Sequence, residues 1–208
     1  MSRRLLLIRH GQTTYNATGR MQGHLDTELS ELGLAQAKQA AGLLAEQGIS
    51  AIVCSDLSRA RATAGVIGER LGLEPVVDAR LRETHLGKWQ GMSSAEVDRD
   101  YPGARAIWRH DPTWAPPEGE SRVDVAKRAR PVIDELMRDP EPWAEGTVLV
   151  VGHGGAIAAL TCHLLGLRHE QYSILSGLKN THWSQLTARP DFDPANPQAS
   201  LEFTAGNV

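Results

Sequence analysis

Leu5-Leu-Leu-Ile-Arg-His-Gly-Gln-Thr-Thr-Tyr-Asn16 is the stretch that decides the fold of this chain. Its four apolar residues, Leu5 to Ile8, form a continuous run that is typical of a short strand covered on both faces. The run ends at Arg9-His10-Gly11, which places a fixed cation and an imidazole where the strand stops. Ligands of open α/β sheets bind beyond the carboxyl ends of the strands. We therefore predict a chemical role for His10 rather than a packing role.

A second segment repeats this pattern late in the chain. The apolar run Thr147-Val-Leu-Val-Val151 leads into Gly152-His-Gly-Gly155, so two predicted strands each end in His-Gly. If these strands are parallel neighbours, His10 and His153 emerge at the same edge of the sheet. A single histidine at a strand end is commonly a hydrogen-bonded structural residue, but the repetition favours one shared site.

Apolar runs and helical periodicity alternate along most of the chain, and this alternation predicts a three-layer α/β/α sandwich with a mostly parallel sheet. On the first expected helix, Leu34, Ala37, Ala41 and Leu44 share one apolar face. The last two strands are weaker candidates and would add an antiparallel edge. Besides the two strands above, strands are expected at Ala51–Cys54, Pro75–Asp78, His182–Thr187 and Ser200–Thr204, and helices from Ser30 to about Gln47, from about Ala60 to Leu71, over Arg122–Arg138 and over Ala156–Leu165.

Residues 86–121 interrupt this alternation. They contain several prolines and three tryptophans, with short helices expected at Ala95–Arg99 and Ala104–Trp108. The segment has too few periodic apolar positions for a core of its own, so we interpret it as a lid-like insertion that covers the site. The whole chain, residues 1–208, is then a single domain. We expect Trp89 to pack inside the lid, while Trp114 could also line a substrate pocket.

Composition excludes several classes of protein. The chain has 208 residues, a formal net charge of −3 and no basic stripe, which argues against a nucleic-acid partner. No apolar run is long enough for a membrane span, and we expect no secretory signal. Cys54 and Cys162 each lie among apolar neighbours, and two such residues are expected to be buried free thiols. We therefore expect a cytoplasmic protein in a reducing compartment.

Several hydrogen-bond donors accompany the predicted histidine edge. Arg9 has a planar fork that suits phosphate oxygens, and free N–H groups at the helix start after Gly154 favour an anion as well. Arg59 also follows a strand end, although it could instead be a surface arginine paired with Asp56. Asn16 could join the cluster or only cap its own loop. Charge-assisted hydrogen bonds of roughly 1.5–3 kcal/mol each would hold a phosphate despite the negative net charge.

Four segments of the chain, taken in order, resemble the signature of the histidine phosphatase (phosphoglycerate mutase-like) superfamily. They are Arg9-His10-Gly11 with Asn16, Ser55-Asp-Leu-Ser-Arg-Ala-Arg-Ala-Thr-Ala64, Leu81-Arg-Glu83 and Gly152-His153-Gly154. Their order over nearly the whole chain makes the resemblance specific. Longer stretches, among them Arg20-Met-Gln-Gly23 and Leu81-Arg-Glu-Thr-His-Leu-Gly87, resemble the superfamily members that hydrolyse glucosyl-3-phosphoglycerate.

The resemblance implies a phosphatase that needs neither metal nor cofactor. His10 would attack phosphorus and become a phosphohistidine. Glu83 would protonate the leaving alkoxide and then activate water, and the like charge of a phosphate dianion favours its protonated form. The alternative for Glu83 is a salt bridge to Arg80 or Arg82. The implied phosphate ligands are Arg9, Asn16, Arg59, His153 and Gly154, and the implied substrate contacts are Gln22 and His85.

Three other functions stay open from the sequence: a cofactor-dependent phosphoglycerate mutase, a broad-specificity acid-type phosphatase, and a non-catalytic phosphate-binding protein. A mutase must keep water away from its phosphohistidine, and the superfamily's mutases resemble one another in a longer, more basic cover. Here no basic pair follows Glu83, and Pro116-Pro-Glu-Gly-Glu120 is acidic. This favours hydrolysis of a small phosphorylated sugar acid. The resemblance also implies a homodimer, with an edge strand near His182 as the expected contact.

Overall fold

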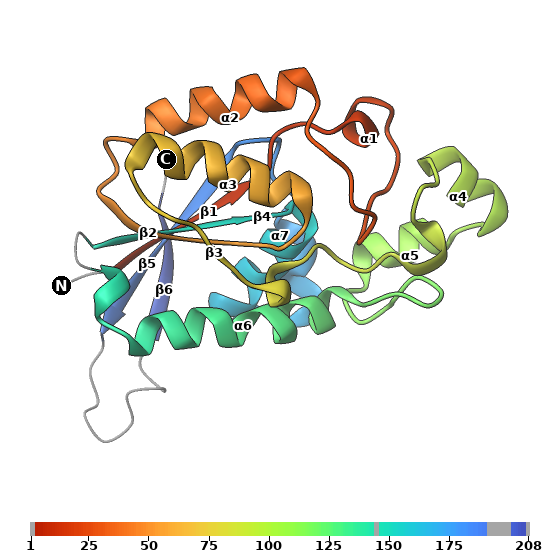
Figure 1. Ribbon diagram of the computed structural model, residues 1–208. Helices are drawn as coiled ribbons and strands as arrows, with labels where there is room; N and C mark the ends of the chain where they lie inside the picture. The colour runs from red at the N-terminus through yellow and green to blue at the C-terminus, as the bar shows by residue number, and fades with distance from the viewer. Residues whose placement is uncertain (1–2, 144–145, 191–200, 207–208) are drawn as a thin grey trace.

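A six-stranded mixed sheet forms the centre of the fold, with strand order β3-β2-β4-β1-β5-β6 (Figure 1). The computed structural model describes residues 3–143, 146–190 and 201–206. The strands are β1 (Arg3–Arg9), β2 (Ile49–Cys54), β3 (Val76–Val77), β4 (Thr147–Gly152), β5 (Trp183–Pro190) and β6 (Leu201–Gly206). The α-helices are α1 (Thr14–Ala17), α2 (Glu31–Leu44), α3 (Ser58–Leu71), α4 (Ser94–Asp100), α5 (Ala104–His110), α6 (Arg122–Arg138) and α7 (Gly154–Leu164). Short 3₁₀ helices are η1 (Ala79–Leu81), η2 (Gly87–Trp89), η3 (Glu141–Trp143) and η4 (His169–Ile174).

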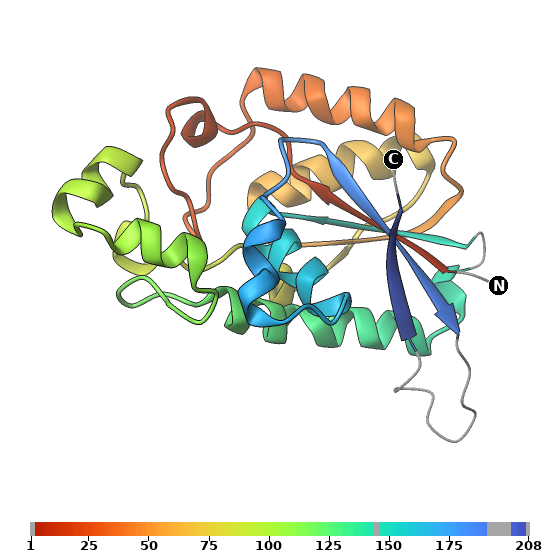
Figure 2. The same ribbon diagram turned by 180° about the vertical axis from the view of Figure 1, so that it is seen from behind.

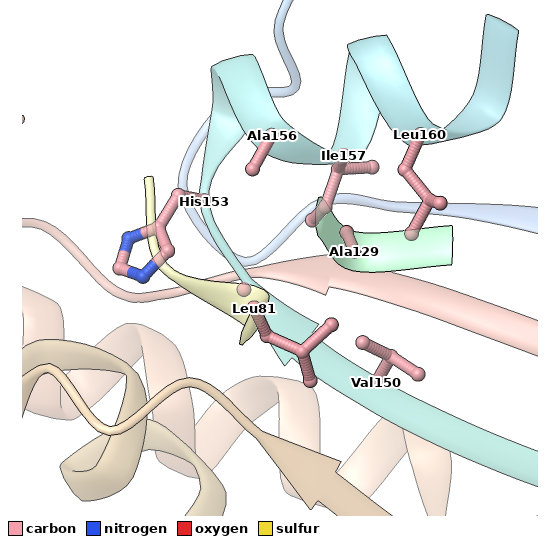
Figure 3. Close-up of a pocket in the computed structure, with 8 residues that line it drawn as sticks. Leu81, Ala129, Val150, His153, Ala156, Ile157 and Leu160 are labelled. Atoms are coloured by element: carbon pink, nitrogen blue, oxygen red, sulfur yellow. The ribbon is translucent and has the colours of Figure 1, made fainter. Parts of the chain in front are cut away.

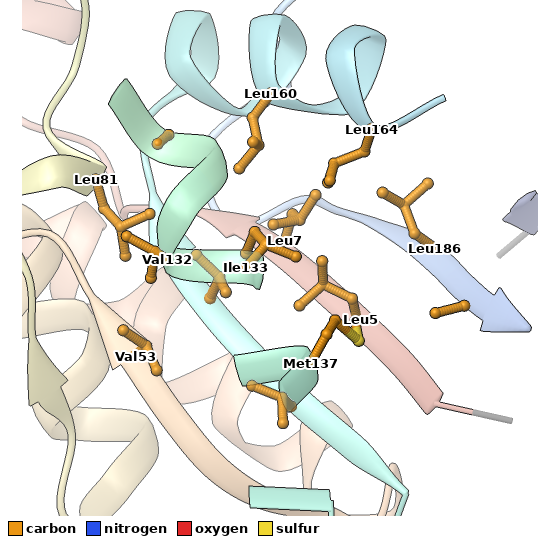
Figure 4. Close-up of a cluster of buried hydrophobic side chains, with 14 of the residues drawn as sticks. Leu5, Leu7, Val53, Leu81, Val132, Ile133, Met137, Leu160, Leu164 and Leu186 are labelled. Carbon is orange, nitrogen blue, oxygen red and sulfur yellow. The ribbon is translucent and has the colours of Figure 1, made fainter. Parts of the chain in front are cut away.

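Helices cover both faces of this sheet. Helices α2 and α3 lie on one face, and α6 and α7 lie on the other (Figures 1 and 2). On the second face, β1 contributes Leu5 and Leu7, which pack against apolar residues of α6 and α7 such as Ile133 and Leu160 (Figure 4). The alternate residues of β1, Leu6 and Ile8, pack toward α2 and α3. Because β1 is buried on both faces, its continuous apolar run is explained, and the predicted three-layer sandwich is confirmed.

The two strands that end in His-Gly are direct parallel neighbours. Their register pairs Leu5 with Val148 and Arg9 with Gly152. The residues that follow each pair are therefore His10 and His153, at the same edge of the sheet. Strands β2 and β3 extend the parallel part, whereas β5 pairs with β1 in the antiparallel direction and β6 pairs antiparallel with β5. The predicted antiparallel addition is confirmed, but β5 is not an edge strand, because β6 covers it.

Helix α2 differs from its prediction in length and in its buried face. It ends at Leu44 rather than near Gln47, and Leu34 is 41% exposed. Its buried face consists mainly of small residues: Gly33, Ala37, Ala40, Ala41 and Leu44. A stripe of small residues lets α2 approach the loop after β1 closely. A sequence pattern that looks for large apolar residues does not detect such a stripe.

The insertion, residues 86–121, contains a small core of its own. Trp89 is fully buried there and packs against Leu86 and Val97, with Trp108 and Trp114 at the periphery. The expected packing of Trp89 inside the segment is confirmed, and the premise that the segment lacks a core is wrong. The aromatic residues of this core are spaced irregularly along the sequence, so a search for helical periodicity does not reveal it. Helices α4 and α5 of this segment lie beyond the carboxyl ends of the central strands (Figures 1 and 2).

Two smaller expectations concern cysteines and membranes. Cys54 and Cys162 are both free and buried, as predicted. Within residues 3–143, 146–190 and 201–206, no helix combines the length and apolarity that crossing a membrane requires.

Gly33 is a position where the fold leaves no room for a side chain. A Cβ at Gly33 would lie 2.0 Å from the backbone oxygen of Gln12 and 2.8 Å from its nitrogen. We predict that Gly33→Ala lowers the free energy of unfolding by about 1–3 kcal/mol, because backbone must move to relieve the clash. Gly42→Ala is the matched control in the same helix, since a Cβ there meets no atom within 4 Å. Urea denaturation of both variants measures the difference, and equal midpoints would contradict the prediction.

Candidate active site

The two imidazoles of His10 and His153 face each other at the carboxyl ends of β1 and β4. Their ring centroids are 5.2 Å apart, and the rings meet edge to face. His10 is 2% exposed, and His153 is fully buried. The His153 ring points away from the apolar side chains of Val150, Ile157 and Leu160, which lie behind it (Figure 3). The predicted convergence of the two histidines is therefore what the strand register produces.

Backbone contacts determine the tautomer of His10. Its Nδ1 lies 2.6 Å from the carbonyl oxygen of Gly11. A carbonyl oxygen only accepts, so Nδ1 carries the hydrogen and Nε2 keeps a free lone pair. The His10 backbone is held on both sides, because its N–H donates to the oxygen of Gly152 and its oxygen accepts from Nδ2 of Asn180. The site thus presents an unprotonated, oriented imidazole nitrogen.

Both histidines are neutral in this environment. Burial lowers the pKa of His10 well below its ordinary value, and the charges of Arg59 and Arg9 lower it further. Burial likewise lowers the pKa of His153, with added effects of His10 and of the same two arginines. Desolvation and like charge both disfavour an imidazolium, so the two causes act in the same direction.

Arg59 is a fully buried cation rather than a surface residue. Its two terminal nitrogens donate to the backbone oxygens of Leu25 and Gly23, each at 2.8 Å. The alternative pairing with Asp56 is wrong, because Asp56 binds Arg82 instead. Burial lowers the pKa of Arg59 below its ordinary value, although the guanidinium stays charged at any physiological pH.

Several buried nitrogen atoms at this edge have no protein partner within the described ranges. They are Nε of Arg9, Nε of Arg59 and Nδ1 of His153. The other ring nitrogen of His153 lies 2.9 Å from the hydroxyl of Ser55, so only Nδ1 is left to face the site. Buried polar groups without partners are rare in native proteins, and each needs an explanation such as a bound ligand. Two such arginine N–H groups, together with the unpartnered ring nitrogen of His153, favour an anion with several oxygens.

The loop after His10 is organised by Asn16 and Thr13. Asn16 does cap its own helical turn, because its Oδ1 accepts from the Thr13 N–H while the Thr13 hydroxyl accepts from the Asn16 N–H. Asn180 also donates to Asn16 Oδ1, which leaves the Asn16 amide nitrogen for a ligand. Oε1 of Gln22 accepts from the hydroxyls of Thr13 and Thr27, so its amide nitrogen is likewise the group that can reach a ligand.

Glu83 does not form the salt bridge that was its alternative. Arg80 pairs with Asp78 and Glu135, and Arg82 pairs with Asp56. The Glu83 carboxylate instead lies on the N-terminus of α7 and accepts from the N–H groups of Gly155 and Ala156, at 3.0 and 2.9 Å. The expectation that these N–H groups are free for a bound anion is therefore wrong, because the anion they hold is the carboxylate of Glu83.

His85 lies beside Glu83 in a group of polar residues that includes His24. The two rings are 4.8 Å apart, and Nε2 of His24 lies 2.7 Å from the backbone oxygen of Glu83. The His85 N–H donates to Glu120, which also pairs with Arg128. Arg128 in turn donates to the backbone oxygen of Glu83. Burial lowers the pKa of His24, which favours its neutral form.

Sequence reasoning missed residues that hold the predicted ones in place. The motif that contains Ser55 does not indicate its contact with His153, and Asn180 belongs to no motif. Thr63 accepts from the Gly11 N–H and donates to the backbone oxygen of Arg59, so it connects the loop after His10 to α3. The signal for Ser55 and Thr63 was present in the segment Ser55–Ala64, whereas no local pattern identifies Asn180.

The arrangement combines a nucleophilic imidazole nitrogen, buried donors and a carboxyl group at one edge of the sheet. The charge of Glu83 partly offsets the lowering of the Arg9 and Arg59 pKa values by burial, so its carboxylate lies near the same site. Such a set can bind a tetrahedral oxyanion, attack its central atom and exchange a proton with a departing oxygen. No group of three or more His, Cys, Asp or Glu residues in the described part of the chain is placed to hold a metal ion.

Known proteins resemble this chain in sequence and in fold. The model of the "Histidine phosphatase superfamily (branch 1)" matches residues 5–193. The glucosyl-3-phosphoglycerate phosphatase of Mycobacterium tuberculosis (strain ATCC 25618 / H37Rv) is 53% identical over 191 residues, covering 89% of this chain and 86% of the relative. Its namesake from Mycolicibacterium vanbaalenii is 52% identical over 198 residues, covering 92% and 88%. A solved mycobacterial glucosyl-3-phosphoglycerate phosphatase in complex with VO3 has a TM-score of 0.91 at 50% identity, covering 98% of this chain and 97% of its own.

The buried histidines predict how stability depends on pH. Because their pKa values are lower in the folded chain than the ordinary 6.5, the unfolded chain binds more protons below about pH 6.5. The free energy of unfolding should therefore decrease as pH falls from about 7.5 to about 5.5. We predict a shallower decrease for His10→Asn, measured by urea denaturation across this range.

His110→Asn is the control for that experiment, because it removes an exposed histidine of α5. If both variants showed the same change in the pH dependence of the free energy of unfolding, the effect would come from the loss of any histidine rather than of a buried one. Parallel pH curves for the wild-type protein and His10→Asn would contradict the prediction.

Proposed function

The chain belongs to the histidine phosphatase superfamily, and from that premise we propose that it hydrolyses glucosyl-3-phosphoglycerate through a phosphohistidine on His10. The observation that carries the proposal is the edge-to-face pair of neutral imidazoles with unpartnered arginine donors beside it. The identities of 52% and 53% to phosphatases of this name, over most of both chains, support the substrate.

In the first half-reaction, Nε2 of His10 attacks phosphorus, and the bond from phosphorus to the substrate's alkoxide oxygen breaks. Arg9, Arg59, Asn16, His153 and Gly154 hold the equatorial oxygens as negative charge spreads over them. The buried guanidinium of Arg59 supports this role, because its Nε has no partner among the described residues while its terminal nitrogens are fixed by backbone oxygens. A relative solved with VO3, an oxyanion similar in shape to a phosphoryl group, is consistent with such a cradle.

Glu83 supplies the proton that the departing alkoxide needs. An alkoxide is a poor leaving group, so a positioned acid contributes roughly 10²–10⁴ in rate. In the second half-reaction the Glu83 carboxylate takes a proton from water, and the resulting hydroxide attacks the phosphohistidine. Inorganic phosphate leaves, His10 regains its free nitrogen, and no metal or cofactor enters the proposed cycle.

The remaining substrate contacts are assigned to Gln22 and His85, at the margin of the phosphate group. Gln22 has its amide oxygen held by two threonine hydroxyls, which supports a donor role for its nitrogen. His85 follows Glu83 by two residues, and its ring contacts that of His24, whose Nε2 lies 2.7 Å from the backbone oxygen of Glu83.

We also propose a homodimer in the cytoplasm, with residues 86–121 acting as a lid over a single domain. Within the described residues β6 pairs with β5, so the strand near His182 offers no open edge for pairing with a second copy.

Relative rates for several phosphomonoesters test the substrate assignment. We predict that kcat/KM is largest for glucosyl-3-phosphoglycerate and smaller for 3-phosphoglycerate. It should be smaller again for a generic aryl phosphate, once kcat/KM is divided by the uncatalysed rate of hydrolysis to correct for the better leaving group. Free phosphate is measured as the product in each case. Formation of 2-phosphoglycerate from 3-phosphoglycerate would instead indicate the mutase, and equal kcat/KM values would indicate a broad-specificity phosphatase.

Two substitutions test the chemical roles. His10→Ala should abolish turnover while inorganic phosphate still binds, since the arginines remain in place.

Glu83→Gln should lower kcat/KM for an alkyl phosphate by about 10²–10⁴ because the amide cannot donate a proton at the required acidity. Binding is followed by calorimetry and turnover by phosphate release. Appreciable activity in His10→Ala would eliminate the phosphohistidine mechanism.

A further inference from the structure

The carboxylate of Glu83 is held unequally at its two oxygens. Oε1 accepts from the N–H of Thr84 at 2.8 Å and from the N–H of Ala156 at 2.9 Å, with the Thr84 hydroxyl at 3.3 Å. Oε2 accepts only from the N–H of Gly155 at 3.0 Å within the described residues. Each carboxylate oxygen has two lone pairs. Two short N–H bonds therefore occupy Oε1, whereas Oε2 keeps one lone pair open.

The absence of a side chain at Gly155 is what allows this contact. A Cβ at Gly155 would lie 2.7 Å from Oε1 of Glu83, and 3.3 Å from both its Cδ and the Thr84 hydroxyl. The three nearest neighbours of that Cβ outside the helix backbone thus belong to the side chains of Glu83 and Thr84. Gly155 adopts helical backbone within α7, so alanine fits its conformation.

We propose that Gly155 is a positioning residue for the general acid, and that Glu83 transfers its proton through Oε2 while Oε1 is the anchor. This inference rests on the proposed role of Glu83 and adds which atom reacts and what holds it. A carboxyl proton must occupy a free lone pair, and only Oε2 has one. The helix N-terminus fixes the other oxygen, so protonation and deprotonation of Oε2 occur without a rotation of the carboxyl plane.

Gly155→Ala separates this role from a structural one. The clash falls on the end of a flexible side chain, so the helix stays intact and alanine is the better helix former. Breaking these hydrogen bonds costs free energy that opposes the gain in helix propensity, so the net change in the free energy of unfolding should be small, while the carboxyl group moves off its donors. A displacement on the order of 1 Å from the reacting geometry lowers rates by about 10²-fold. The expected variant is therefore well folded and impaired in one step of the reaction.

The decisive readout is the dependence of kcat/KM on the leaving group. This constant contains only the steps up to departure of the leaving group, so hydrolysis of the phosphohistidine does not affect it. An alkyl phosphate such as glycerol 3-phosphate needs a proton on its leaving oxygen, whereas p-nitrophenyl phosphate releases a stable anion. We expect Gly155→Ala to lower kcat/KM for glycerol 3-phosphate by about 10- to 100-fold and to leave that for p-nitrophenyl phosphate nearly unchanged.

Three further variants complete the experiment. Gly65→Ala is the matched control, because a Cβ at this exposed position of α3 meets no atom within 4 Å. Glu83→Gln should show the same selectivity for the alkyl substrate, but to a larger extent. Thr84→Val removes only the hydroxyl at 3.3 Å from Oε1 and should give a smaller loss in the same direction. It keeps the inference testable if Gly155→Ala folds poorly.

Three results would overturn the inference while leaving the proposed function standing. Equal losses of kcat/KM for both substrates in Gly155→Ala would place its effect on phosphate binding, and no loss for either would remove its positioning role. A crystal structure with VO3 in which Oε1 rather than Oε2 approaches the apical oxygen would reverse the assignment of atoms. Failure of the wild-type protein to hydrolyse any phosphomonoester would instead refute the proposed function itself.

Discussion

The parallel pairing of β1 with β4 is the constraint on which the rest of the site depends. Both strands are buried on both faces, so apolar residues on each side fix how far each strand extends before the chain turns. A shift of one residue would exchange the faces that Leu6 and Leu7 present to the two helical layers. The register that avoids this also places Arg9 opposite Gly152, and the two imidazoles follow at once. Packing of the core thus determines the geometry of the chemistry.

Burial then gives this edge its electrostatic character. Arg59 and the two imidazoles are buried, Arg9 is partly buried, and within the described residues the Nε atoms of both arginines have no acceptor. Such groups are unfavourable in the free protein, since burying a polar group without a hydrogen bond costs free energy. A bound phosphate dianion supplies the missing acceptors, so part of the binding free energy reflects the relief of that cost. This local excess of donors explains how a chain of net charge −3 can select an anion.

The features that follow from local sequence were predictable, and those that depend on distant partners were not. The apolar run of β1, the repeated His-Gly ends and the helix Arg122–Arg138 are each encoded by neighbouring residues. The docking of Glu83 on α7 joins residues more than 70 positions apart, and no periodicity encodes that contact. The core around Trp89 in the insertion was missed for a related reason, because its side chains come from irregularly spaced turns. Leu34 was expected on the buried face of α2 from its spacing, but it is exposed, because small residues of the helix pack against the rest of the protein instead.

The base of the insertion and the segment that carries Glu83 are parts of one hydrogen-bonded unit. The backbone of His85 exchanges hydrogen bonds with Glu120, since its N–H donates to the carboxylate and its oxygen accepts from the Glu120 N–H. The Lys88 N–H donates to the oxygen of Pro117, and a Cβ at Gly87 would lie 2.0 Å from that same oxygen, so the two ends of the insertion are in close contact. Arg128 of α6 then connects Glu120 to the backbone of Glu83. The base of the insertion is therefore joined to the backbone of Glu83 through few covalent and hydrogen bonds.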